Sequence, residues 1–342
     1  MKTLLLFLSM ALAMFAPARA AVFVAAHQDD LILLMGRSTL LEIQSGAPTV
    51  LVVLTAGDGG NGSAPVSVAG ASAMYFNQMG NPYYRVRHNA NEAAIAQWLP
   101  PDSSTIAHRA IDYVSPEVQF LEKVSIANVT IYNLNLPDGR LDALQSGKLH
   151  RLTDITGVNR YTAETVRETL RRIIANHHPG QASVQVHLPE HTPAYSAPGY
   201  NDGGEAALHG DHADHTAAGR LVRDALALPA YACVRKTVYM GYGVSATPDS
   251  MSVQEKLAQI RAYTALDAVL KNQGNISFHS GGRGLQLGSM DSFHMGFFGK
   301  QRWRDGGGGG NCAFGGMVAS LPDARRASWH SVGRLQRQWA WK

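Results

Sequence analysis

The stretch that decides the fold is Ala21-Val22-Phe23-Val24-Ala25-Ala26, which runs directly into His27-Gln28-Asp29-Asp30. An unbroken apolar run of this length indicates a strand that is buried on both faces of a sheet. An imidazole and two carboxylates at the carboxyl end of such a strand lie at the edge where open α/β sheets bind their ligands. The sequence therefore predicts an α/β protein with a polar site at the end of its first strand.

A second polar cluster, His209-Gly210-Asp211-His212-Ala213-Asp214-His215, leads into a helical pattern from Thr216 to Val222. His212 and His215 are three residues apart, so a helix would place both side chains on one face. Spacing alone would also allow His209 and His212 to form the pair. The cluster therefore offers two histidines that could face a common ligand.

The two clusters together have the composition of one metal site. Taken singly, a His-x-Asp-Asp turn is more often a helix cap, and a His-x-x-His pair is more often a polar helix face. Both clusters border strand–helix junctions, however, in a chain with only 16% charged residues. A zinc ion that keeps a water needs three protein ligands and one open position. The expected ligands of zinc, or of another divalent metal, are His27, Asp30 and His215.

Residues 1–20 have the features of an export signal. Lys2 gives a positive start, residues 4–15 are apolar, and Ala18-Arg19-Ala20 fits a signal-peptidase site. We therefore expect residues 21–342 to be exported, to the periplasm or the cell exterior. Loss of Lys2 and Arg19 takes the formal net charge from +4 to +2, so charge gives no reason to expect nucleic-acid binding. No later stretch is long enough to span a bilayer.

Apolar runs and helical patterns alternate along the rest of the chain. Expected strands cover residues 49–55, 129–134, 183–187 and 237–241, and expected helices cover 31–45, 85–98, 162–176 and 253–269. This alternation predicts a Rossmann-like, mainly parallel sheet with helices on both faces. Because each half of the site comes from a different strand–helix unit, we expect one catalytic domain over residues 21–342. A glycine-rich extension would begin at about residue 270.

The chain has two cysteines, Cys233 and Cys312. In an oxidising compartment two cysteines favour one disulfide, and the alternative is a pair of buried thiols. We expect the disulfide, which would tie the glycine-rich extension to the sheet.

The motifs quoted above resemble those of the LmbE-like (PIG-L-like) zinc-dependent N-deacetylases. Ala26-His27-Gln28-Asp29-Asp30-Leu31 stands where that family has Ala-His-Pro-Asp-Asp-Glu, with Gln28 and Leu31 as departures. His212-Ala213-Asp214-His215 is similar to the family's His-Pro-Asp-His, and Gly219 follows at the same spacing. Smaller marks are Leu54 to Gly59, Arg87 and Leu136-Pro137-Asp138-Gly139. The resemblance covers most of residues 21–242 and implies the LmbE-like fold.

The resemblance also implies a hydrolase that removes an N-acyl group, usually the N-acetyl group of an amino sugar. Its substrate would be a small molecule or a glycan. Zinc held by His27, Asp30 and His215 would polarise the amide carbonyl and lower the pKa of a bound water to about 7.

Further roles follow from the same resemblance. The side chain of Asp29 would diverge from that of Asp30, which leaves Asp29 free as general base and then as acid to the leaving amine. His212 would face the developing oxyanion, preferably as an imidazolium. Substrate oxygens would contact Arg87 and Asp58, although a surface position at a helix start is the alternative for Arg87.

Other functions would suit parts of this pattern. A zinc amidase acting on a conjugate without a sugar needs the same metal centre, and a carbohydrate-binding relative without catalysis would keep the same fold. A dinucleotide-binding enzyme is excluded, because His27-Gln28-Asp29-Asp30 stands where its glycine motif would be needed. Residues 188–208, with His191, and several aromatic side chains are expected to shape the pocket, namely Tyr195, Tyr200, Phe293, Phe297, Phe298 and Trp303.

Overall fold

In a computed structural model of the chain, the residues that the structure describes are 21–57, 83–178, 181–192, 211–274, 292–310 and 312–314. They contain an eight-stranded sheet with the strand order β11-β10-β9-β1-β2-β5-β4-β3. The strands of this sheet are β1 (Ala21–Ala25), β2 (Thr49–Thr55), β3 (His108–Asp112), β4 (Leu121–Ile126), β5 (Val129–Leu136), β9 (Gln185–Pro189), β10 (Arg235–Tyr239) and β11 (Trp303–Asp305).

The centre of the sheet is parallel and its margins are antiparallel. Strands β10, β9, β1, β2 and β5 run in one direction, whereas β11, β4 and β3 pair antiparallel to their neighbours. Two small ladders lie outside this sheet, β6 (Leu152–Thr153) with β7 (Arg160–Tyr161) and β8 (Gln181–Ala182) with β12 (Cys312–Ala313). The predicted mainly parallel α/β sheet is confirmed.

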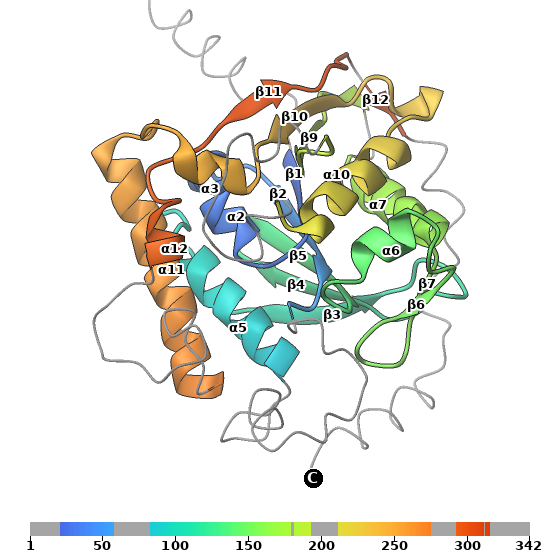
Figure 1. Cartoon of the computed structure of the whole chain (residues 1–342), viewed down its shortest axis with the longest axis horizontal. Coiled ribbons are helices and arrows are strands. Elements are labelled where there is room, and N and C mark those ends of the chain that lie inside the picture. Colours follow the sequence, from blue (N-terminus) through green and yellow to red (C-terminus); the bar gives the residue numbers. More distant parts are fainter. Residues whose placement is uncertain are drawn as a thin grey trace, which may run out of the picture.

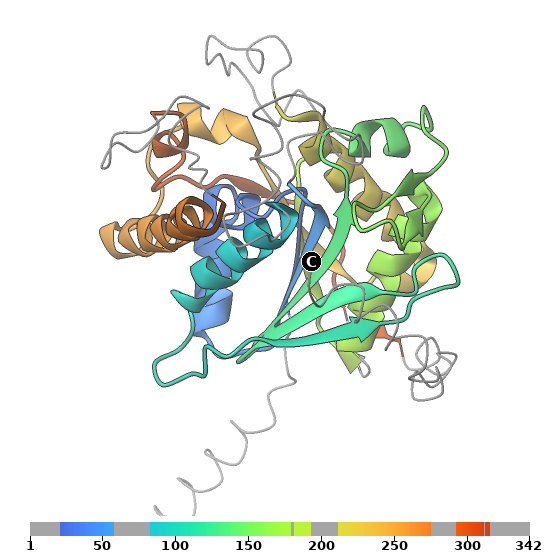
Figure 2. The same ribbon diagram turned by 90° about the horizontal axis from the view of Figure 1, so that it is seen from below.

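Helices cover both faces of the sheet (Figures 1 and 2). One layer contains α2 (Asp30–Leu33), α3 (Gly36–Gln44), α5 (Tyr83–Ala96), α11 (Val253–Gly274) and α12 (Ser292–Met295). The other contains α6 (Leu141–Gln145), α7 (Ala163–His177) and α10 (Ala213–Ala225). Two 3-10 helices, η1 (Pro229–Tyr231) and η2 (Tyr242–Ala246), flank β10. Within the described residues, no helix is long and apolar enough to cross a membrane.

The alternation of β1 explains why its sequence is apolar throughout. Val22 and Val24 point into the core under α7 and α10, whereas Phe23 points into the core under α5 and α11. The neighbouring strand β2 divides its side chains between the two cores in the same way. A central parallel strand buries both faces, so a polar side chain in it would lose its hydration without a partner.

The predicted helix over residues 31–45 is in fact two short helices, α2 and α3. In a continuous helix the carbonyl of Ile32 would accept a hydrogen bond from the amide of Gly36. Here that carbonyl accepts a hydrogen bond from the Nε2 of Gln259 at 2.8 Å, and the helix is interrupted at Met35. A tertiary contact from α11 therefore interrupts a pattern that reads locally as one helix.

Helices α7 and α10 begin and pack as their sequences indicate. Thr162 is confirmed as the N-cap of α7, and its side chain accepts from the amide of Thr165 in a capping box. Gly219 of α10 allows a close approach to β9, since a Cβ at this position would lie 2.3 Å from the carbonyl oxygen of Pro189. This packing fixes the start of α10 over the carboxyl end of β9.

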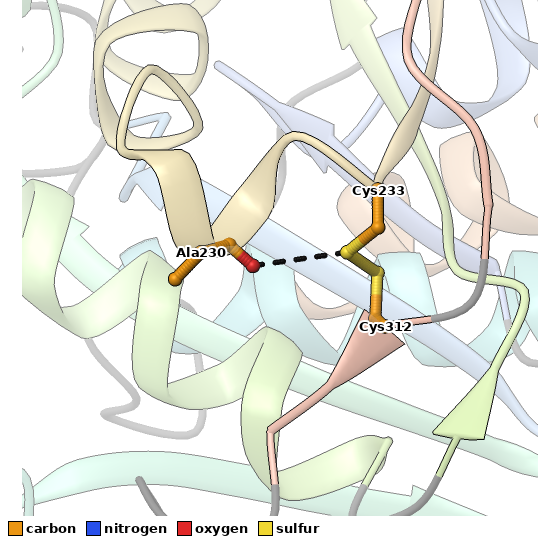
Figure 3. Close-up of a disulfide and its surroundings, with 3 residues drawn as sticks. All are labelled: Ala230, Cys233 and Cys312. Atoms are coloured by element: carbon orange, nitrogen blue, oxygen red, sulfur yellow. Dashed lines mark hydrogen bonds between the residues drawn. A yellow bond between two sulfur atoms is a disulfide. The ribbon is translucent and has the colours of Figure 1, made fainter.

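Cys233 and Cys312 form a disulfide, the pairing expected from the sequence (Figure 3). It joins the segment before β10 to β12, which pairs with β8. The sulfur of Cys233 also lies 3.7 Å from the carbonyl oxygen of Ala230. A bonded sulfur carries no proton, so this approach is a packing contact.

Candidate metal centre

The carboxyl ends of the central strands bring the two polar clusters together. His27 follows β1, Asp138 follows β5, and His215 lies in the first turn of α10. The rings of His27 and His215, which are far apart in sequence, have centroids 5.2 Å apart. The expected meeting of both clusters at this sheet edge is therefore what the structure shows.

His27 is held from two sides by carboxylates. Its Nε2 lies 2.9 Å from Oδ1 of Asp138, and its Nδ1 lies 3.5 Å from Oδ2 of Asp30. The same oxygen of Asp30 accepts the backbone amide of His27 at 2.8 Å. The turn after β1 thus locks Asp30 against the ring that precedes it.

His215 is held in a similar way. Its Nδ1 lies 2.8 Å from Oδ1 of Asp211, which also accepts the backbone amides of His212 and Tyr242. Its Nε2 lies 3.1 Å from Oδ1 of Asp30. Among the described residues, however, no hydrogen-bond partner has acceptable geometry for this fully buried nitrogen. Such an atom needs another partner, because an unsatisfied buried nitrogen is costly.

The arrangement of both histidines fits a bound metal. Metal-ligating histidines usually give one ring nitrogen to the metal and the other to an outer carboxylate. Here Asp138 and Asp211 hold the outer nitrogens, and the inner nitrogens both face Asp30. Two imidazoles and one carboxylate are a common donor set for catalytic zinc. His27, Asp30 and His215 would hold the ion.

The local charge also favours a cation. Burial opposes a charged imidazole, yet Asp138 and Asp30 raise the pKa of His27 well above its usual value. Against the same burial, Asp30 and Asp211 raise the pKa of His215 to about 10. The carboxylates therefore demand positive charge, which a divalent ion would supply while both imidazoles stay neutral.

Two groups of side chains in the described part of the chain have ligand atoms within 4.8 Å of one another. One is His27 with His212 and His215, and the other is His27 with Asp138, His212 and Asp214. Neither is the expected set, since both include His212 and omit Asp30. His212 must therefore be considered as a ligand in place of Asp30.

His212 has a second role that bears on this alternative. It is the N-cap residue of α10, and its Nδ1 accepts the backbone amide of Asp214 at 3.3 Å. A nitrogen that accepts a hydrogen bond carries no proton, so the proton of neutral His212 sits on Nε2. That tautomer suits a hydrogen-bond donor better than a metal ligand. Burial, with repulsion from His27 and His215, lowers the pKa of His212 to about 4. The expected imidazolium is thus wrong, because the ring is neutral near pH 7.

Asp214 serves as an anchor for the loop that carries Asp138. Its Oδ2 accepts the amide of Gly139 at 2.7 Å, and its Oδ1 accepts the amide of Leu141 at 3.0 Å. The side chain is completely buried, and burial raises the pKa of this carboxyl group. With both oxygens occupied by backbone donors, Asp214 is poorly suited to bind a metal.

Asp29 points away from Asp30, as expected for neighbours in a turn. Its Oδ1 accepts a hydrogen bond from Nη2 of Arg87 at 3.1 Å. Arg87 is buried, so the alternative of a surface arginine is wrong. This pairing ties α5 to the turn after β1 and gives Asp29 a fixed orientation beside the candidate metal ligands.

Several expected contributors lie outside the described residues. These are Asp58, His209, Tyr195, Tyr200 and the side chain of Phe293. Phe297 and Phe298 belong to the core rather than to a pocket wall, whereas Trp303 is 57% exposed on β11. An apolar helix-end sequence does not by itself distinguish a pocket wall from core packing.

Sequence reasoning missed four residues that shape this centre. Asp138 and Asp211 hold the outer histidine nitrogens, Gln28 contacts Arg87, and Tyr242 packs edge-on against the ring of His215. Asp138 and Asp211 stood inside quoted motifs, so proximity to the ligands was a usable signal. Tyr242 follows β10 and had no such signal, since only the fold brings it to His215.

No protein-family model matches the chain, and no curated protein matches it in sequence. The chain is similar to several solved structures. N,N′-diacetylchitobiose deacetylase from Pyrococcus horikoshii is 15% identical over 75% of this chain and 74% of that chain, with a TM-score of 0.40. The A40926 pseudoaglycone deacetylase Dbv21 is 14% identical over 75% of this chain and 84% of that chain, with a TM-score of 0.42.

A third similar structure has a different reaction. GalB, the 4-carboxy-2-hydroxymuconate hydratase from Pseudomonas putida KT2440, is 12% identical over 72% of this chain and 77% of that chain, with a TM-score of 0.36.

Proposed function

We propose that this protein is an exported, zinc-dependent N-deacetylase that acts on an N-acetylated amino sugar or glycoconjugate. One observation carries the proposal. His27 and His215 each have one nitrogen held by an outer carboxylate and the other directed at Asp30, with Asp29 beside them but turned away. That arrangement supports a metal site with a separate carboxylate that would serve proton transfer.

Hydrolysis of an amide needs a polarised carbonyl, a deprotonated water, a stabilised oxyanion and a protonated amine. Zinc bound by His27, Asp30 and His215 would polarise the carbonyl and lower the pKa of a water to about 7. The remaining requirements fall to side chains of the chain itself.

Asp29 is the candidate general base. Arg87 holds its Oδ1, and among the described residues no hydrogen bond occupies its Oδ2. That oxygen can take a proton from the attacking water and later give it to the leaving nitrogen. A positioned acid–base group of this kind contributes roughly a hundredfold to ten-thousandfold to rate.

His212 is the candidate donor to the oxyanion. Its ring lies edge-on to His27 with centroids 4.7 Å apart, so it borders the same space as the metal ligands. With Nδ1 engaged by the helix amide, its Nε2–H can donate to an oxygen that gains negative charge. A neutral donor suits this role, since no proton has to be lost or regained.

The substrate class rests on the export signal and on the family resemblance. An exported enzyme meets cell-wall or extracellular glycans and secreted conjugates. The motif resemblance points to N-acetyl groups on amino sugars among these. A non-sugar amide remains the alternative substrate for the same metal centre.

Acetate release tests the proposal. Purified protein, loaded with one equivalent of zinc, is incubated with N,N′-diacetylchitobiose, longer N-acetylglucosamine oligosaccharides and a panel of N-acyl amino acids. We expect acetate from the saccharides, no acetate after treatment with a chelator, and recovery on addition of zinc. Cleavage of the acyl amino acids alone would assign a general amidase, and no cleavage of any amide would contradict the proposal.

Metal analysis of matched variants tests the ligand assignment. His27→Ala, Asp30→Ala and His215→Ala should each lose bound zinc. His178→Ala is the control, because His178 is also buried but lies at the end of α7, away from the carboxyl ends of the strands. Full zinc retention in all three ligand variants would overturn the site.

A further inference from the structure

A chain of polar contacts connects the carboxyl end of β2 to Asp29. The Nε2 of Gln28 donates to the carbonyl of Ala56 at 3.2 Å, and its Oε1 accepts from Nε of Arg87 at 3.1 Å. Arg87 in turn donates from Nη2 to Oδ1 of Asp29. Gln28 is completely buried, so both ends of its amide depend on these partners.

Gly57 gives independent evidence that this arrangement is built into the fold. Its φ is +61°, and a Cβ at this position would lie 2.5 Å from Oε1 of Gln28 and 2.6 Å from Nε of Arg87. Only a residue without a side chain leaves room for the amide and the guanidinium to meet. The loop after β2 is therefore shaped around the contact between Gln28 and Arg87.

The geometry points to Gln28 as the positioning residue of the general base, an inference that rests on the proposed deacetylase function. Gln28 touches no reacting atom. It takes one edge of the Arg87 guanidinium, which leaves Nη2 directed at Asp29. The guanidinium is planar and its N–H groups have fixed directions, so holding Nε also fixes the direction of Nη2.

Loss of the Gln28 side-chain amide would remove the acceptor of Nε of Arg87. Arg87 is a long side chain, and its contact with Asp29 uses a single hydrogen bond. If Nε lost this acceptor, the guanidinium could turn toward Tyr83, with which it also interacts, and Asp29 would lose its orientation. A displacement of about 1 Å at a reacting group can lower the rate on the order of a hundredfold.

Gln28→Met tests the inference, because methionine keeps the length of the side chain and removes both polar ends. With zinc loaded and N,N′-diacetylchitobiose as probe, we expect kcat to fall roughly tenfold to a hundredfold. KM and zinc content should change little. In the variant Gln28→Met/Arg87→Met, kcat should equal that of Arg87→Met alone, since Gln28 acts through Arg87. Additive losses would instead mean a general structural role and would overturn the inference.

A crystal structure of the zinc-loaded Gln28→Met protein supplies a second readout that needs no turnover. The contact between Arg87 and Asp29 should be lost there, and its persistence would overturn the inference. Asn128→Leu is the matched control. Asn128 also bridges backbone carbonyls through its side-chain amide, but it lies at the amino end of β5, away from the site. If the wild type releases no acetate, the proposed function fails, and the crystal structures still decide whether Gln28 positions Asp29.

Discussion

Two polar clusters, each built around a buried histidine, lie on this fold, and they balance charge in opposite ways. The site cluster consists of His27, Asp30, Asp138, Asp211 and His215. The ion-pair cluster consists of Arg85, His88, Arg109 and Glu122, between α5 and the antiparallel margin of the sheet. Both contain a buried histidine beside a carboxylate, so residue types alone do not separate them.

The ion-pair cluster carries its own counter-charges. Glu122 contacts Arg85, lies 3.1 Å from Nη1 of Arg109 and lies 3.3 Å from Nδ1 of His88. Although burial favours the neutral acid, these three groups lower the pKa of Glu122 to about 2. Glu122 is paired with two guanidinium groups, so the cluster needs no further ion, which marks it as structural.

The site cluster lacks such a balance. Three carboxylates surround two imidazoles without a guanidinium or ammonium group among them, and the pKa of His27 is raised. A metal centre is therefore indicated by carboxylates whose negative charge no neighbouring side chain balances, and not by buried histidines alone.

The largest effect is expected at Asp29, where a substitution should lower turnover without loss of zinc. Asp29→Asn keeps the shape of the side chain but removes its capacity to take a proton. We expect kcat to fall a hundredfold or more, with zinc content unchanged. Steady-state kinetics and metal analysis on the same preparation measure both. An Asn variant with wild-type turnover would remove Asp29 from the mechanism.

Glu122→Gln is expected to act on stability and not on zinc. The depressed pKa of Glu122 corresponds to about 3 kcal/mol of unfolding free energy at pH 7. The sign follows from the direction of the shift: this contribution is present above about pH 4.5 and is lost as pH falls toward about 2.

Urea unfolding across this pH range measures the contribution of Glu122. The difference between wild type and Glu122→Gln should shrink as the pH falls. A constant difference, or a loss of zinc in the variant, would remove the distinction between the two clusters.

Removal of the metal should lower the unfolding free energy of the wild type. This loss should not depend on the ion-pair cluster. Binding to the folded state alone stabilises it by about 2.7 kcal/mol when free zinc is a hundredfold above Kd. Thermal unfolding with and without chelator should therefore differ in wild type and in Glu122→Gln. It should not differ in His215→Ala, and a chelator effect of equal size there would place the ion elsewhere.

The smallest expected effect concerns the outer carboxylates. Asp138→Asn and Asp211→Asn keep the side-chain volume but weaken the hold on the outer nitrogens of His27 and His215. Zinc affinity should fall roughly tenfold to a hundredfold in each, as measured by competition with a chelating dye. Asp112→Asn, which alters a partner of Tyr132 at the sheet margin, should leave the affinity unchanged.

The sequence predicted the parallel centre of the sheet because its strands are apolar throughout. It did not predict the antiparallel margin. Strand β4 reads Leu-Glu-Lys-Val-Ser-Ile, and Glu122 is buried in it only because Arg85 and Arg109 approach from elsewhere in the chain. Local patterns cannot show such compensation, since the partners are set by the tertiary fold.

The site was predictable in part for the same reason. The meeting of His27, Asp30 and His215 could be predicted from the sequence, because the carboxyl ends of parallel strands and the starts of the helices that follow them lie on the same side of the fold. The neutral state of His212 could not, since it follows from capping and burial that depend on the packed structure. The buried position of Arg87 likewise depends on Gln28 and on the turn at Gly57.

One divalent ion is expected to bind between His27, Asp30 and His215. Anomalous diffraction at the zinc absorption edge, from crystals of the zinc-loaded protein, tests it most directly. We expect one strong peak within bonding distance of Nδ1 of His27, a carboxylate oxygen of Asp30 and Nε2 of His215, with His212 unbound. A peak bound to His212 and not to Asp30, or no peak at this edge of the sheet, would contradict it.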